Sequence, residues 1–587
     1  MLRTLRKIST KKPLALIIFV IVIFQVLLIF QGFDVCDEGF SLTFYQQFFN
    51  DASSVEYNFV YYLSGLVGGL WYKLFPDGGI IAFRVLTVLV NTLTFYLAFK
   101  LLHKYLGFWQ TVIGLFMVLF VNDFGFLAFY HNHLTSLLAV ISITALFYGV
   151  FKTKNWLLVV AGVIVGINVM TRLINLSMLA LILAIVYYGY LSRYKIRLVL
   201  GQMALFLMGF ALGIFLNVLL LSALGHTNTM YLALESVMHL GVKDDSGHNL
   251  KTLLLTYFFQ WLHVLLLALA VVSTIILSLW LIQRRSVGQW LLYPILIVFL
   301  AYLIRFEGLF FINSLGLVGT VWMLLAFNRK RHVKLLALLA LIMLVVLPMG
   351  SGGGLKSSDN IALWLALPFF VYFVLNVLQN RSYKTPLWGF QSEVGSTNNY
   401  AVTMLNVFIA VFSLVKTYSV ANQAYFDPGS RFDKTYQVQN PLANHVYTTQ
   451  SRAEIVNTLL DNLENYVSED DYVLLYDNIP MVHFLTKTRP YMYNPWVWIY
   501  DGATFADKLK KAETKIDGLP IVVQQKFTTF GKFSEPRDDY MREDKINDNL
   551  FNEGRTKAMN AFLKRHHYHI VWSNPYFNIY QADSKTL

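Results

Sequence analysis

The chain has 587 residues, of which 56% are hydrophobic and 14% charged, and its mean hydropathy is +0.52. This composition excludes an ordinary soluble globular protein and predicts a polytopic α-helical membrane protein. The net charge of +13 does not indicate a nucleic-acid groove, because the positive excess lies in the apolar part of the chain. The single cysteine, Cys36, excludes an intrachain disulfide and a thiolate metal cluster.

The N-terminal stretch MLRTLRKISTKK is basic and is followed by an apolar run at 14–30. No small-residue cleavage pattern separates this run from FDVCDEGF. We therefore predict a retained first membrane helix and not a signal peptide.

Apolar runs along the chain predict about 13 membrane helices. With the N-terminus in the cytoplasm, Lys and Arg gather in the inner connections, and among the acidic residues before the last span only Glu393 falls inside. The functional face is therefore predicted to be extracytoplasmic. The predicted spans lie at 14–30, 82–102, 109–121, 134–151, 156–170, 173–191, 198–222, 252–282, 289–304, 309–327, 335–349, 361–379 and 401–419.

The first outer loop, 31–81, carries three carboxylates where the first helix emerges: Asp34, Asp37 and Glu38. Ionisable groups at this depth are costly unless they face a cavity or a partner, so we interpret them as lining a catalytic cavity. The alternative is a solvated loop with ordinary juxtamembrane acids. An aromatic-rich segment, Tyr57 to Phe75, would invert every later connection if it spanned the membrane, so we predict two juxtamembrane helices here, 40–49 and 57–75.

The last part of the chain has the composition of a soluble domain, which divides the sequence into a membrane domain, 1–420, and an extracytoplasmic α/β domain, 421–587. DYVLLYDNIPMVHFLT predicts a strand, a turn and a helix, PIVVQQKF predicts a strand, and YHIVWSNPYFNIYQAD predicts two strands around a turn. The segment has no Gly-rich phosphate loop and no zinc-ligand spacing. A lid or scaffold without catalytic residues is the favoured interpretation.

Several motifs carry a resemblance to a known family: CDEGFSLTFYQQFF, NFVYYLSGLVGGLWYKLFPDGGIIAFRVL, MTRLINLS, LPMGSGGGLKSSDN and DYVLLYDNIPMVHFLTKTRPY. Together with the predicted layout, they resemble the C-type (GT-C) integral-membrane glycosyltransferases, and most closely the bacterial lipid A aminoarabinose transferases and protein O-mannosyltransferases. The resemblance covers nearly the whole chain. It implies transfer of a hexosyl or pentosyl group, with inversion, from a polyprenyl-phosphate donor to a lipid, polysaccharide or protein acceptor at the outer face of the cytoplasmic membrane.

The resemblance also implies roles for single residues. Asp37 matches the family's first-loop acid, proposed as general base or metal ligand, and Glu38 matches its neighbour. Asp123 matches the second-loop acid, and these three are the predicted catalytic residues. The second loop reads Asn122-Asp123 in place of a paired-acid motif, a departure that puts metal binding in question. The residues predicted to bind substrate near these acids are Asp34, Tyr61, Tyr62 and Arg84.

The chemistry needs further side chains irrespective of family. Attack of a hydroxyl or amine on an anomeric carbon releases a phosphate, so the site needs a base and a positive charge for the departing oxygen. Asp37 is the predicted base, and the predicted cations are Arg172, Arg305 and Lys356. Lys356 follows a glycine-rich run, 351–354, whose N–H groups would form an anion nest. Each cation is alternatively an interfacial snorkelling residue, and Arg305 is alternatively the partner of Glu307.

A divalent metal, Mg²⁺, Mn²⁺ or Zn²⁺, is a further hypothesis. Its predicted ligands are Asp37, Asp123 and His131, with His133 and His239 near them. The alternative is that the histidines are hydrogen-bonded structural residues, because side chains two positions apart on a helix point in different directions.

Two other classes of protein stay open. A lipid or polysaccharide transporter or flippase would also have many spans, but repeated halves, broken helices and midplane charges, which are typical of transporters, are not visible in the sequence. A non-catalytic GT-C-like assembly protein is the other alternative, which the departure at Asn122-Asp123 favours.

Overall fold

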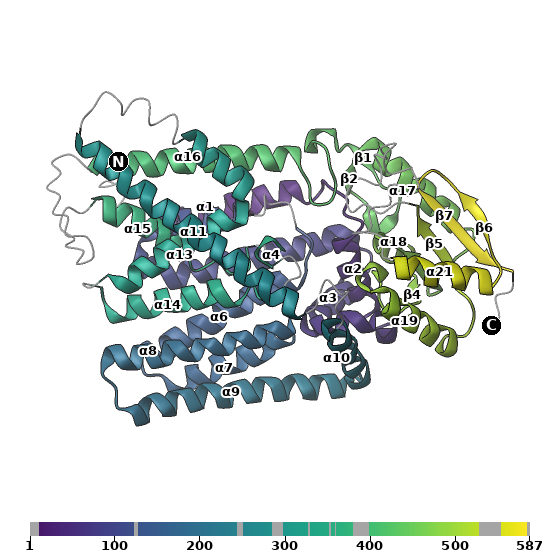
Figure 1. The fold of residues 1–587 in the computed structure, drawn as a ribbon, viewed down its shortest axis with the longest axis horizontal. Helices are drawn as coiled ribbons and strands as arrows, with labels where there is room; N and C mark the ends of the chain where they lie inside the picture. The colour runs from purple at the N-terminus through teal and green to yellow at the C-terminus, as the bar shows by residue number, and fades with distance from the viewer. Residues whose placement is uncertain are drawn as a thin grey trace.

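The computed structural model describes residues 11–121, 127–242, 250–284, 297–326, 329–350, 354–357, 360–379, 398–526 and 553–583. A body of long helices occupies one end of the molecule, and a smaller α/β domain built from the C-terminal part of the chain occupies the other (Figure 1). The predictions on Glu393, on Asn122-Asp123 and on the first half of the span at 289–304 lie outside the described residues.

The helical body matches the predicted apolar runs. Its helices are α1 Lys11–Leu28, α4 Gly79–Leu106, α5 Phe108–Val121, α6 His131–Phe151, α7 Asn155–Val169, η3 Leu173–Leu181 with α8 Ile182–Ser192, α9 Ile196–Ala223, α11 Leu250–Arg284, η4 Leu303–Glu307 with α13 Gly308–Leu325, α14 Arg331–Val346, η5 Gly354–Ser357, α15 Leu367–Gln379 and α16 Asn398–Asn422. Within the described residues, seven helices are long and apolar enough to cross a membrane, and three shorter apolar helices accompany them. The chain is thus a multi-pass membrane protein, and the total of about 13 spans stays a prediction.

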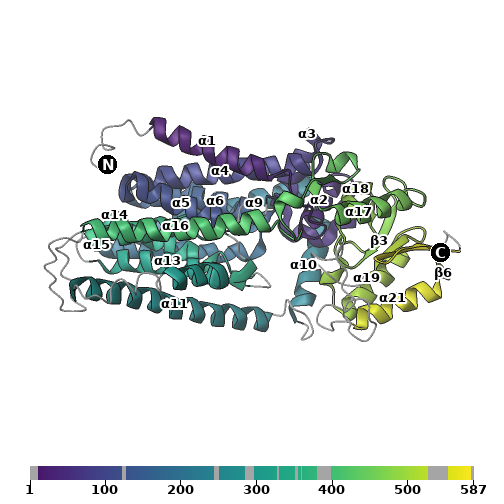
Figure 2. The same ribbon diagram turned by 90° about the horizontal axis from the view of Figure 1, so that it is seen from above.

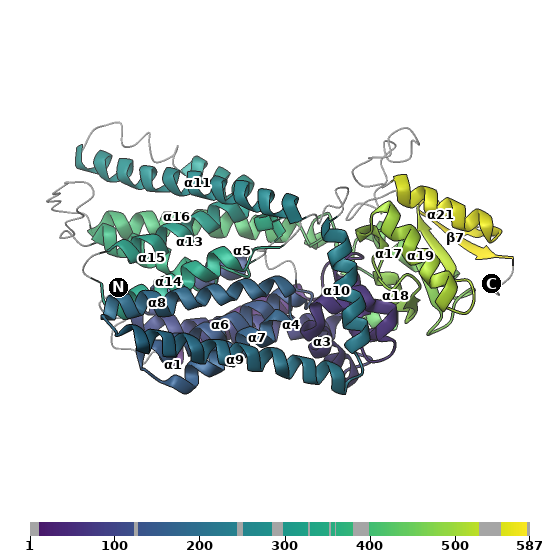
Figure 3. The same cartoon turned by 60° about the horizontal axis from the view of Figure 1, so that its bottom comes forward.

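Close helix packing in this body depends on small residues. Helices α7 and α9 lie side by side (Figures 1 and 3). A Cβ on Gly162 would lie 2.0 Å from the Phe206 carbonyl oxygen, and one on Gly209 would lie 2.1 Å from the Val159 carbonyl oxygen. Glycine at these positions lets the two backbones touch, the packing mode common between membrane helices.

The first loop folds into the predicted juxtamembrane helices: α2 Asp37–Gln47, η2 Ala52–Tyr61 and α3 Tyr62–Leu74. Their inner faces share an aromatic core in which Phe48 stacks on Phe59 at 5.4 Å between ring centroids. A further helix, α10 Thr227–Val242, packs on η2 (Figure 3). The sequence analysis did not predict α10, because its mixed composition lacks a long apolar run.

The C-terminal domain contains a five-stranded sheet of order β4-β3-β5-β7-β6, with β3 Tyr472–Tyr476, β4 Arg489–Pro490, β5 Ile521–Gln525, β6 Tyr568–Ser573 and β7 Phe577–Ala582. Strands β4, β3 and β5 are parallel, and β7 and β6 are antiparallel. The predicted strands are confirmed; β4 was missed because it is only two residues long and includes a proline. The remaining elements are η6 Arg431–Asp433, β1 Tyr436–Gln437, η7 Pro441–Ala443, β2 Tyr447–Thr448, α17 Gln450–Leu463, α18 Met481–Thr486, η8 Val497–Ile499, α19 Gly502–Lys515 and α21 Glu553–Arg565.

The C-terminal domain is docked on the first loop, and the two share one hydrophobic core (Figure 2). The Met481 N–H at the start of α18 donates to the Val35 carbonyl at 3.0 Å. A Cβ on Gly39 of α2 would lie 2.2 Å from the Met481 nitrogen, so only glycine permits this approach. The domain therefore acts at least as a scaffold that holds the start of α2 in place.

Candidate active site

Asp34 fixes the beginning of α2. Its carboxylate accepts hydrogen bonds from the Cys36 N–H at 2.7 Å and the Glu38 N–H at 2.8 Å, and the side chain is 4% exposed. Two otherwise unsatisfied helix N–H groups are thereby capped. Burial, and the neighbouring charges of Asp37 and Glu38, raise the pKa of Asp34. Asp34 was predicted to bind substrate, but in the structure both its carboxylate oxygens accept hydrogen bonds from backbone N–H groups.

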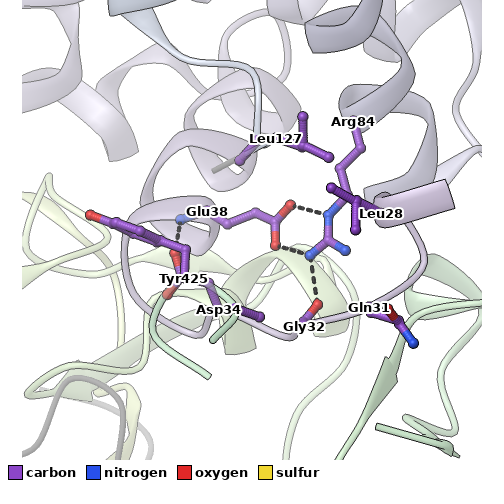
Figure 4. Close-up of a pocket in the computed structure, with 10 residues that line it drawn as sticks. Leu28, Gln31, Gly32, Asp34, Glu38, Arg84, Leu127 and Tyr425 are labelled. Carbon is purple, nitrogen blue, oxygen red and sulfur yellow. Dashed lines mark hydrogen bonds and ion pairs between the residues drawn. The ribbon is translucent and has the colours of Figure 1, made fainter. Parts of the chain in front are cut away.

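Glu38 belongs to a buried ion pair. Its two oxygens accept from Nε and Nη2 of Arg84, at 2.8 and 2.7 Å, and Arg84 also donates to the carbonyls of Ile29 and Gly32 (Figure 4). The pair ties α2 to α4 and to the end of α1. Glu38 was predicted to be catalytic and Arg84 to bind substrate, but each is engaged by the other, which gives both a structural role.

Asp37 differs from both neighbouring acids because its side chain is only half-buried. The Tyr425 hydroxyl donates to Asp37 Oδ2 at 2.5 Å, and within the described residues no other side chain hydrogen-bonds to this carboxylate. Burial raises the pKa of Asp37, and the hydrogen bond from Tyr425 opposes that rise. A carboxylate that keeps one oxygen available and has a raised pKa is suited to accept a proton.

Tyr61 lies near both Asp37 and Arg172. Burial raises the pKa of Tyr61, while the Arg172 guanidinium lowers it and the Asp37 carboxylate raises it further, so the phenol is within electrostatic reach of both charges. Arg172 is 6% exposed and donates to the carbonyls of Leu347 and Met349, each at 3.2 Å. His131 stacks on Tyr61, with ring centroids 4.1 Å apart. The structure thus brings these predicted residues together.

The other two predicted cations are exposed. Arg305 lies over the rings of Phe306 and Tyr418, and Lys356 lies over Phe310. The described contacts do not connect either of them to Asp37, and residues 351–353 of the predicted anion nest (Ser351, Gly352 and Gly353) lie outside the described residues. Arg305 was alternatively predicted to pair with Glu307, but Glu307 pairs with His263, at 2.8 Å between Oε2 and Nε2.

Tyr62 points away from the predicted site. Its side chain is 0% exposed and packs among Phe48, Phe59 and His226. The neighbouring positions 61 and 62 therefore have different functions: Tyr61 faces the Asp37 region, and Tyr62 belongs to the aromatic core of the first loop.

Only part of the predicted metal site lies within the described residues. Among them, no group of three or more His, Cys, Asp or Glu side chains is placed to hold a metal ion. His131 is stacked on Tyr61, and His133 accepts from the Tyr130 N–H through Nδ1 at 3.4 Å. The third predicted ligand, Asp123, and the side chain of His239 lie outside the described residues.

A small pocket lies beside these groups. It has about 280 Å³ of empty space, including space open to solvent, and its polar side chains are those of Gln31, Asp34, Glu38, Arg84 and Tyr425 (Figure 4). Tyr425 was not predicted from the sequence, because it lies 388 positions from Asp37 and directly follows α16.

The fold and the site define a multi-pass membrane protein whose C-terminal α/β domain is docked on a carboxylate-bearing first loop. Neither the protein-family models nor the curated proteins include a match to the chain. Among solved structures, the chain is similar to ArnT from Cupriavidus metallidurans bound to undecaprenyl phosphate, with a TM-score of 0.49 and 11% identity over 97% of this chain and 98% of that one.

The chain is also similar to the oligosaccharyltransferase of Archaeoglobus fulgidus. The complex with Zn and sulfate has a TM-score of 0.42 and 11% identity over 87% of this chain and 68% of that one. The form tethered with an acceptor peptide has a TM-score of 0.43 and 10% identity over 97% and 74%. At these TM-scores and identities, the likeness says nothing about this chain's chemistry.

Proposed function

We propose that the chain is a membrane glycosyltransferase that moves a sugar from a polyprenyl-phosphate-linked donor to an acceptor at the outer face of the cytoplasmic membrane. The observation that carries the proposal is the state of Asp37, a half-buried carboxylate held by Tyr425 at the start of α2. Arg172 lies close enough to influence the same phenol, Tyr61, as Asp37 does. A base and a cation are the two groups that displacement of a phosphate requires.

In the proposed step, Asp37 accepts the proton of an acceptor hydroxyl or amine as the acceptor's oxygen or nitrogen forms a bond to the anomeric carbon. The bond from that carbon to the phosphate oxygen breaks, and its electron pair leaves with the lipid phosphate. A single displacement of this kind inverts the anomeric configuration. Arg172 would stabilise the departing phosphate, since carbonyl contacts hold its guanidinium in place before the donor arrives.

A lipid-borne donor is in keeping with the apolar outer surface of the membrane helices and the first loop. Leu70 and Leu74 of α3 and the following residue, Phe75, are exposed, and only 11% of the apolar stretch Lys251–Ile275 in α11 is buried. In a bilayer these surfaces would face lipid, so a polyprenyl chain can approach from the membrane while the acceptor approaches from water. In this proposal the N-terminus lies in the cytoplasm and the C-terminal domain lies outside.

The proposal is tested by comparing a deletion strain with its parent. Mass spectrometry of envelope glycolipids, polysaccharides and glycoproteins should show the loss of one sugar mass from one acceptor class, which names both the sugar and the acceptor. Unchanged glycan masses would contradict the proposal. A product that keeps its mass but moves from one membrane leaflet to the other would favour a transporter instead.

A further inference from the structure

Tyr425 comes from the junction between the helical body and the C-terminal domain. It directly follows α16 and lies in a tight turn in which the Asp427 N–H donates to the Ala424 carbonyl at 3.2 Å. The ring is 37% exposed, and its hydroxyl donates to Asp37 Oδ2 at 2.5 Å. The phenol therefore reaches Asp37 from the opposite end of the sequence.

The turn is anchored by a charged group that lies entirely inside the protein. Asp427, with its side chain 0% exposed, pairs with Lys434 at 3.0 Å and accepts from the Phe33 N–H at 2.8 Å. Arg452 donates to the carbonyls of both Phe33 and Phe426, at 2.7 and 2.8 Å. The same buried frame thus holds Phe33, which lies four residues before Asp37, and Phe426, which directly follows Tyr425.

We propose that Tyr425 is a positioning residue that holds the Asp37 carboxylate in the orientation needed to accept the acceptor's proton. This inference rests on the proposed function. By occupying Oδ2, the phenol fixes the rotation of the carboxylate and leaves Oδ1 for the acceptor. The C-terminal domain would then contribute to the rate of the reaction as well as to the support of α2.

Other ionisable groups face Asp37, and their roles differ from that of Tyr425. Asp34 caps the helix backbone, Glu38 is held by Arg84, and Tyr61 stacks on His131. None of these side chains has a described hydrogen bond to the Asp37 carboxylate. The orientation of Asp37 should therefore depend on Tyr425 more than on any of them.

The test compares Tyr425→Phe with Tyr436→Phe. Tyr436, in β1 of the same domain, is 45% exposed and takes no part in the site, so it controls for loss of a phenolic hydroxyl. Full-length variants are placed in membrane vesicles from the deletion strain, whose own lipids supply donor and acceptor, and the initial rate of formation of the missing glycan is measured. Undecaprenyl phosphate is used as the probe of donor-site affinity, and thermal unfolding reports folding.

Tyr425→Phe should lower the initial rate by about 10- to 100-fold, the value of a hydrogen bond to a charged group. Affinity for undecaprenyl phosphate and the unfolding midpoint should match those of Tyr436→Phe. In an Asp37→Asn background, Tyr425→Phe should change the residual rate by less than about twofold, because no base remains to be oriented.

Equal rates for Tyr425→Phe and Tyr436→Phe would overturn the inference. A rate loss in Tyr425→Phe that is fully explained by weaker binding of undecaprenyl phosphate or by a lower unfolding midpoint would also overturn it. So would a double variant, Asp37→Asn with Tyr425→Phe, whose rate loss is the product of the two single losses. Failure of the proposed function itself looks different, because the deletion strain would then have unchanged glycan masses and would lack no glycan.

Discussion

Glu38 and Arg84 form a bidentate ion pair that is almost completely buried: Glu38 is 1% exposed and Arg84 is 6% exposed. Asp37, the adjacent residue, is half-buried and bonded to a phenol. Successive side chains on a helix point about 100° apart, so the two acids face different surroundings. The sequence alone does not distinguish the two acids, but their environments do. Glu38 is engaged in a structural ion pair, and the Asp37 carboxylate is the one that we expect to accept a proton.

Replacing Glu38 by Gln should damage stability more than chemistry. The change leaves the Arg84 charge buried without its partner, which costs about 3–5 kcal/mol in the free energy of unfolding. The matched control is Glu469→Gln, which breaks an exposed pair with Lys487 and should cost about 1 kcal/mol or less. Thermal unfolding of the purified full-length variants measures both. Equal stability of the two variants would return Glu38 to the list of candidate catalytic acids.

Gly39→Ala should weaken the docking of the C-terminal domain. The new methyl group would meet the Met481 backbone at 2.2 Å and push α18 away from α2, with an expected cost of about 1–3 kcal/mol or more. Gly201→Ala on α9 is the control, because nothing lies within 4 Å of the added carbon. Limited proteolysis and unfolding midpoints should show a looser domain for Gly39→Ala alone. Equal proteolysis and equal unfolding midpoints for the two variants would contradict the close packing of α18 on α2.

Arg172→Ala should weaken binding of undecaprenyl phosphate by about 10- to 100-fold, since it removes hydrogen bonds to a charged phosphate. Arg172→Lys should bind with intermediate affinity, because lysine lacks the planar fork. Arg197→Ala, an exposed arginine on α9, is the control and should bind normally. Normal binding by Arg172→Ala, together with lost binding by Arg305→Ala or Lys356→Ala, would move the phosphate site to that residue.

His483 should make the protein less stable in acid. It is buried in α18, where burial lowers its pKa to about 3, against about 6.5 in an unfolded chain. Between these values the unfolded chain binds a proton that the folded protein does not, so stability falls as the pH falls below about 6.5. At pH 5 the loss is about 2 kcal/mol. His483→Gln should show a smaller loss between pH 7 and pH 5, and an unchanged loss would contradict this assignment.

The fold was largely predictable from the sequence because membrane helices are specified locally. The long apolar runs predicted the helices, and the alternation of charge predicted that Tyr57 to Phe75 does not span the membrane, in agreement with η2 and α3. Helix α10 and the short strand β4 escaped prediction because neither has a distinctive local pattern.

The site was predictable only in part because its contacts join distant segments. Asp37 was identified from local sequence and family resemblance, whereas its partner Tyr425 lies 388 positions away. The capping role of Asp34 is local, because its carboxylate accepts from the N–H groups of Cys36 and Glu38, two and four positions ahead, at the start of α2. Tyr61 and Tyr62 were grouped as substrate-binding aromatics, but an aromatic residue in a sequence does not reveal which face of the helix it occupies.

The most direct test of the account is the rate of glycan formation by Asp37→Asn, expressed in the deletion strain at wild-type protein levels. Asparagine keeps the shape of the side chain and removes the base, so the initial rate should fall by about 10²–10⁴-fold. Undecaprenyl phosphate should still bind within about twofold of the wild-type affinity, and the unfolding midpoint should be unchanged. Wild-type glycan formation by a folded Asp37→Asn protein would contradict the account.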